Sequence, residues 1–201
     1  MIFNLVAEGH MEEIVAAQLL PFCEHGLGTV YGKRGCSYIK EKATHFCNLA
    51  TSDTGVLVLT DFRDAKVSCV VEALDLYVYN KLPQPPKNFI CRFAINELES
   101  WLLADRKSIA KFLKINESNV PINPDDESMP KRTLINLARK STRKIIREGL
   151  APPPGHIADV GPLYISLLSD FILNFWNIDT ACCHSPSLNR CVQRLREIKN
   201  G

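Results

Sequence analysis

Short apolar runs alternate with amphipathic segments over the first half of the chain. Ile2–Ala7, Gly55–Thr60 and Asn88–Ile95 are apolar runs of strand length. Such runs are typical of buried β-strands. Between them, Met11–Phe22 and Val67–Tyr79 carry apolar residues at helical spacing. Strands that alternate with helices predict an α/β fold, a mostly parallel sheet flanked by helices.

Strand signals fade after about Ile115, and the rest of the chain has helical patterns. Gly26–Ser37 predicts a further strand or an irregular connection. Residues 115–130 are polar and acidic and contain three prolines, so they predict a loop. We therefore expect an α/β core over 1–115 and a helical C-terminal extension over 116–201 packed on it. One further helix is expected within the core, over Lys40–Ala50. Three are expected in the C-terminal extension, over Lys131–Glu148, Gly161–Ile178 and Ser185–Ile198.

Composition narrows the class of protein. The 201 residues are 46% hydrophobic and 23% charged, with a formal net charge of +2, which is ordinary globular usage. No apolar run approaches the roughly 18 residues that cross a bilayer, and the N-terminus lacks a signal-type pattern, so we expect a cytoplasmic protein that does not enter a membrane. The eight cysteines form no CxxC pair, which favours reduced thiols in the core over a structural zinc site.

Carboxylates follow each of three predicted strands. In open α/β folds the chemistry sits at the carboxyl ends of the strands, so these acids are expected at one edge of the sheet. Two of them, Glu8 and Glu12, are four residues apart, a spacing at which like charges repel unless a cation, a basic neighbour or solvent separates them. The candidate metal ligands are Glu8, Glu12, Asp61, Asp64, Glu97 and Glu99.

Carboxylate oxygens are ligands that Mg²⁺ takes in proteins, together with waters and phosphate. A centre of this kind can hold two cations that clamp the attacking and leaving oxygens of a phosphodiester. The alternative is that the acids are separate helix caps and solvated side chains, because acids are also favourable at helix N-termini.

The residues at these positions resemble a known family. A strand followed by Glu8-Gly9 and Glu12, with an Asp motif after a later strand, is similar to the Toprim domain of topoisomerases, primases and overcoming-lysogenization-defect nucleases. The finer pattern resembles the small Toprim-like proteins of Domain of Unknown Function family 4276. Its features are Ala7-Glu8-Gly9-x-x-Glu12, Leu57-Val58-Leu59-Thr60-Asp61, Glu97-x-Glu99-x-Trp101-Leu102-Leu103-Ala104-Asp105, Pro130-Lys131 and Ser185-Pro186-Ser187-Leu188.

The resemblance implies a Toprim-like sheet and phosphodiester hydrolysis that depends on Mg²⁺ or Mn²⁺. It also implies an ABC-type ATPase partner in a bacterial antiphage defence locus. Glu8 would be a metal ligand or general acid/base, Glu12 and Asp61 metal ligands, and Glu99 the later carboxylate. The chain departs from the Toprim Asp-x-Asp pattern at position 63, where Arg63 stands and the next acid is Asp64. Arg63 either pairs with phosphate or weakens one metal site.

A basic segment follows the acidic loop. Residues 131–147 contain seven positive charges and no acid, against a net charge of +2 for the whole chain. Phosphate backbones are the usual partner of such a face, and the alternative is a solvated helix face balanced by the acids of the preceding loop. Lys131 is the candidate catalytic cation for the developing charge on phosphate. The candidate nucleic-acid-binding residues are Arg63, Lys131, Arg132, Arg139, Lys140, Arg143 and Lys144.

Two functions are consistent with these features. The first is a metal-dependent nuclease that cuts DNA or RNA and works with an ATPase. The second is a non-catalytic Toprim-like subunit that binds a partner protein or nucleic acid, in which Arg63 has replaced a metal. The two differ in whether the carboxylates are required for hydrolysis.

Overall fold

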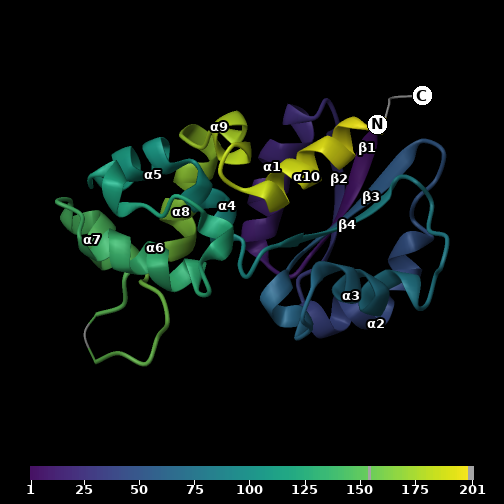
Figure 1. Ribbon diagram of the computed structural model, residues 1–201, viewed down its shortest axis with the longest axis horizontal. Helices are drawn as coiled ribbons and strands as arrows, with labels where there is room; N and C mark the ends of the chain where they lie inside the picture. The colour runs from purple at the N-terminus through teal and green to yellow at the C-terminus, as the bar shows by residue number, and fades with distance from the viewer. Residues whose placement is uncertain (154, 199–201) are drawn as a thin grey trace. The chain divides into compact units, whose positions relative to one another are not determined.

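The computed structural model describes residues 1–153 and 155–198 (Figure 1). Among these residues, none of the helices combines the length and the apolar character needed to cross a membrane. The elements in chain order are β1 (Ile2–Ala7), α1 (His10–Phe22), β2 (Gly26–Gly32), α2 (Cys36–Cys47), β3 (Thr54–Asp61), η1 (Phe62–Ala65), α3 (Val70–Leu74), η2 (Asp75–Tyr79), β4 (Phe89–Ala94), α4 (Glu99–Ala104), α5 (Arg106–Leu113), η3 (Glu117–Asn119), η4 (Pro124–Asp126), α6 (Pro130–Arg139), α7 (Lys144–Leu150), α8 (Tyr164–Asn174), α9 (Ile178–Cys182) and α10 (Pro186–Arg196).

The four strands form one parallel sheet in the order β2-β1-β3-β4. This confirms the predicted α/β fold with a helical C-terminal part. Both faces of the sheet are covered, which is why β1, β3 and β4 are mostly apolar runs in the sequence. On one face, Val58 and Phe93 pack with Phe46 of α2 in a shared core that includes Tyr77. On the other face, α1 covers the sheet together with α10 (Figure 1).

The chain divides into two compact units. The first comprises Met1–Ile95 together with the C-terminal segment from Ser187, and the second is Asn96–Pro186. The boundary predicted from the sequence lies at residue 115, where strand signals fade. In the structure the first unit ends at Ile95, directly after β4. Asn96, at the start of the second unit, has a left-handed backbone with φ 61°, a conformation that Asn tolerates.

The C-terminal helix α10 completes the first unit. His25, which follows α1, places its Nε2 2.9 Å from the carbonyl oxygen of Leu195 in α10. The thiol of Cys23 lies 3.9 Å from the carbonyl oxygen of Val192. The His25 ring also packs on Phe3 of β1, with ring centroids 4.9 Å apart. Helix α10 is therefore joined to the sheet layer through the turn that follows α1.

The basic segment is two helices, and the single helix predicted over 131–148 is wrong. Helix α6 ends at Arg139 and α7 begins at Lys144. Ser141, between them, is buried, and its hydroxyl accepts a hydrogen bond from the Arg143 backbone N–H at 3.1 Å. Arg147 Nη1 donates to the Ser141 carbonyl at 2.7 Å. A serine that bonds a neighbouring backbone N–H offers the chain an alternative to helix, and it ends the helix here.

Candidate metal centre

The carboxyl ends of β1, β2 and β3 meet at one edge of the sheet. The last residue of β1, Ala7, is paired with Gly32 at the end of β2 and with Leu59 near the end of β3. Strand β1 lies between β2 and β3 in the sheet, so the chain runs from β1 to one side for β2 and then to the other side for β3. Such a reversal of strand order opens a crevice beyond the strand ends, where open α/β proteins bind their ligands.

Gly32 holds the end of β2 against β1. Its backbone has φ 93°, and a Cβ at this position would collide with the carbonyl oxygen of Ala7. The next backbone N–H, from Lys33, donates to that same oxygen at 2.8 Å. Only glycine combines this positive φ with so close an approach. The contact sets the direction of the segment that leads to Cys36 at the start of α2.

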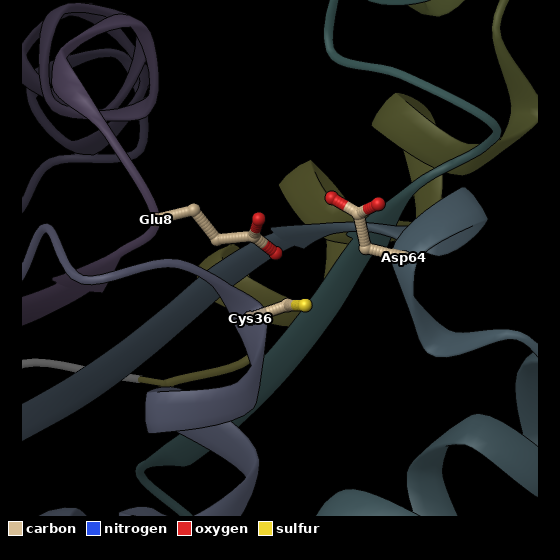
Figure 2. A group of neighbouring side chains, drawn as sticks. All are labelled: Glu8, Cys36 and Asp64. Carbon is tan, nitrogen blue, oxygen red and sulfur yellow. The ribbon is translucent and has the colours of Figure 1, made fainter.

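Three side chains from three different elements converge at this edge. Glu8 follows β1, Cys36 is the first residue of α2, and Asp64 lies in η1 after β3. A carboxylate oxygen of each acid and the Cys36 thiol lie within 4.8 Å of one another (Figure 2). Glu8 and Cys36 are partly buried and Asp64 is exposed. The cluster is therefore reachable from solvent on the Asp64 side.

The electrostatics of the cluster favour a positive charge. The pKa of Glu8 is raised from its usual 4.5 to about 8, first by burial and then by the nearby carboxylates of Asp64 and Glu12. The backbone N–H of Asp61, which donates to Glu8 Oε1 at 3.3 Å, acts in the opposite direction. A divalent cation between the carboxylates would reverse both the repulsion and the preference for the protonated acid.

The remaining predicted ligands of the first unit border this cluster. Asp61, the last residue of β3, contributes its backbone N–H to Glu8. Glu12 is buried, and its Oε2 accepts the backbone N–H of Gly9 at 3.0 Å at the start of α1. Its carboxylate thus caps a helix and also repels Glu8, so the capping alternative describes part of its role. Arg63 is exposed in η1.

The donor set fits a divalent cation. Two carboxylates suit Mg²⁺ or Mn²⁺, which keep waters and substrate oxygens in their other positions. A thiolate instead suits softer ions such as Zn²⁺. Glu8 and Asp64 are thus the residues that would hold Mg²⁺ or Mn²⁺, and Cys36 would add affinity for a softer metal. Cys36 was not singled out from the sequence, where it is one of eight scattered cysteines.

A second cluster lies within the second unit, around α4. Glu99 is buried, and its Oε1 accepts a hydrogen bond from the Tyr164 hydroxyl at 2.7 Å. Lys131 Nζ lies 3.7 Å from the same oxygen. The Lys131 backbone N–H donates to Glu97 Oε2 at 3.0 Å, at the start of α6. Both predicted carboxylates therefore bind Lys131, one through its side chain and the other through its backbone.

Glu97, Glu99 and Lys131 thus join the start of α4 to the start of α6 within the second unit. A single site built from all three predicted strand ends stays a prediction. Tyr164 is buried, and no local sequence pattern indicates that its hydroxyl contacts Glu99. The other predicted nucleic-acid-binding residues of this unit are exposed: Arg132, Arg139, Lys140, Arg143 and Lys144.

Comparison with known proteins adds one match. A family model described as Domain of unknown function (DUF4276) matches residues 7–150, which include Glu8, Cys36, Asp64, Glu99 and Lys131. No curated protein and no solved structure matches the chain.

Proposed function

The chain belongs to the family Domain of unknown function (DUF4276), and we propose that it is a metal-dependent nuclease that hydrolyses phosphodiester bonds of DNA or RNA. The observation that carries the proposal is the convergence of Glu8 and Asp64, with Cys36, within 4.8 Å at the carboxyl edge of the sheet. The proposal extends to a Toprim-like type of nuclease that acts in the cytoplasm beside an ABC-type ATPase in antiphage defence. That extension rests on the sequence resemblance alone.

The residues have distinct roles in the proposed reaction. A bound Mg²⁺ or Mn²⁺ would supply Lewis-acid stabilisation of the phosphate oxygens and lower the pKa of a water. Glu8 is fixed on one oxygen by the Asp61 backbone N–H, which orients the other toward the cluster. Asp64 is exposed and faces the side from which a phosphodiester can approach. Because the pKa of Glu8 is raised in the metal-free protein, metal binding near neutral pH would be coupled to release of the Glu8 proton.

The test is cleavage of plasmid, single-stranded DNA and tRNA in Mg²⁺ or Mn²⁺. We expect Glu8→Gln and Asp64→Asn each to lower the rate at least a hundredfold, since each removes a charged ligand while keeping the side-chain shape. Glu41→Gln and Asp53→Asn are the matched controls, because both positions are exposed carboxylates outside the cluster. They should cut like the wild type.

Metal binding is measured separately from cleavage. Titration of the apo protein with Mn²⁺, followed by calorimetry, should give a binding isotherm that Glu8→Gln and Asp64→Asn abolish and the controls retain. A wild type that binds no metal and never cuts, with or without an ATPase, would point to the non-catalytic alternative. Carboxylate variants that cut as fast as the wild type would refute the proposed mechanism.

A further inference from the structure

The second unit contains a hollow lined by three lysines that the proposed nuclease site does not use. Its volume is about 520 Å³, and its lining includes Lys111, Lys114 and Lys140. A volume of this size is typical of a pocket for a small organic ligand. None of the residues that line it is acidic. Three positive charges in one hollow exceed the net charge of +2 for the whole chain.

Helix ends explain only part of this charge. Lys114 caps the C-terminus of α5, and Lys140 caps the C-terminus of α6. A helix C-terminus carries a partial charge of roughly −0.5, so two helix ends offset about one of the three lysines. About two positive charges are left for a ligand. Glu117, the acid closest in sequence to the lining, lies 3.8 Å from Arg106 and does not line the hollow.

The walls of the hollow are organised by hydrogen bonds. Lys140 Nζ donates to Asn119 Oδ1 at 3.3 Å, and the Asn119 amide nitrogen donates to the carbonyl of Asn116 at 3.2 Å. Asn119 therefore links the end of α6 to the turn that follows α5. Thr142 adds a hydroxyl and Ile115 an apolar surface to the same lining. Ammonium and hydroxyl groups are hydrogen-bond donors to phosphate oxygens, and charged donors make the stronger bonds.

We infer that this hollow binds the backbone phosphates of a single nucleic-acid strand. The three lysines are exposed and come from two helices, so successive phosphates of a continuing chain can reach them. The choice of a nucleic acid over another phosphate ligand rests on the proposed nuclease function. The lysine contacts themselves are independent of the metal centre, because they belong to other residues.

The experiment measures binding without cleavage. Fluorescence anisotropy of a short labelled single strand, in EDTA and over a series of salt concentrations, compares the wild type with the triple variant Lys111→Gln, Lys114→Gln and Lys140→Gln. We expect at least tenfold weaker binding and a salt slope smaller by roughly 2, because each phosphate contact to a single strand contributes about 0.7. A matched triple variant, Lys81→Gln, Lys87→Gln and Lys107→Gln, removes the same charge from exposed positions outside the hollow and should bind like the wild type.

Competition separates the possible sources of phosphate. Unlabelled single strand should displace the probe, whereas inorganic phosphate and mononucleotides should displace it only at far higher concentration. Equal displacement by inorganic phosphate would overturn the assignment to a strand, and so would a wild type that binds no strand. A correctly folded lysine variant, checked by its thermal midpoint, that binds like the wild type would overturn the inference as well.

The two proposals fail in different ways. Glu8→Gln should lose cleavage and keep strand binding in EDTA, since Glu8 does not line the hollow. Normal cleavage by Glu8→Gln refutes the metal mechanism and leaves the lysine contacts intact. Normal strand binding by the lysine variant refutes the binding of a strand at the hollow and leaves the metal mechanism intact.

Discussion

Replacing Glu8 by Gln should change how the stability of the metal-free protein depends on pH. In the folded protein the pKa of Glu8 is raised from 4.5 to about 8, first by burial and then by the carboxylates of Asp64 and Glu12. The unfolded chain therefore releases this proton at lower pH than the folded chain does. The stability that protonated Glu8 contributes is fully present below about pH 4.5 and is lost as pH rises through about 8.

The size of the effect follows from the shift. Each pKa unit corresponds to about 1.36 kcal/mol, so the full shift would be worth roughly 5 kcal/mol. Glu8 is only partly buried and faces an exposed neighbour, so solvent screening reduces this figure. We expect the free energy of unfolding of the wild type to fall by about 2 kcal/mol between pH 5.5 and 8.5 relative to the variant, as an order of magnitude.

The assay is urea unfolding of both proteins in EDTA at several pH values within that range. This pH range excludes the titration of Glu13, whose pKa is lowered, and of Cys23, whose pKa is raised to about 11. Glu41→Gln, at an exposed position, is the control. Adding Mn²⁺ should flatten the pH dependence of the wild type and leave the variant unchanged. If the free energy of unfolding depends on pH in the same way for the wild type and Glu8→Gln, the raised pKa of Glu8 is refuted.

Three further substitutions test other parts of the structure. Cys36→Ser should weaken Zn²⁺ binding at least tenfold in calorimetry and change Mn²⁺ binding much less, since only the softer ion gains from a thiolate; equal losses for both ions would contradict its role. Gly32→Ala should lower the free energy of unfolding by about 2 to 4 kcal/mol in urea titrations, because a Cβ meets the last carbonyl of β1. Gly155→Ala, with a similar positive φ and open space around it, should cost no more than about 1 kcal/mol. Tyr164→Phe should cost about 1 to 3 kcal/mol, because the buried carboxylate of α4 loses a donor, whereas the exposed Tyr79→Phe should be neutral in the same titration.

Strands β1, β3 and β4 could be predicted from the sequence because they are mostly buried, whereas the half-buried, glycine-rich β2 left a strand and an irregular connection both open. Val56, Leu57 and Val58 are consecutive and buried, which leaves no helical or alternating pattern to confuse the assignment. Parallel strands also bring their carboxyl ends to one edge. The meeting of an acid after β1 with an acid after β3 could therefore be expected from strand order alone, and Glu8 and Asp64 do meet.

The rest of the site depends on contacts that no local pattern encodes. Cys36 lies beside Glu8 after a segment in which Gly32 and Gly35 both have positive φ, and glycines in a sequence do not say where a later side chain points. Tyr164 and Glu99 are far apart in sequence, and their hydrogen bond depends on how the helices of the second unit pack. The break between α6 and α7 depends on Ser141, whose competing hydrogen bonds outweigh a helical pattern on both sides.

The return of the chain to the first unit has a consequence for synthesis. All four strands and the residues of the metal cluster are translated before the second unit, but α10, which belongs to the first unit, is translated after it. A ribosome-bound chain can therefore pair its strands and fold the intervening segment while one face of the sheet is covered by α1 without α10. The elements that carry Glu8, Cys36 and Asp64 are therefore made before α10, and the first unit reaches its full set of helices only after the second unit has been translated.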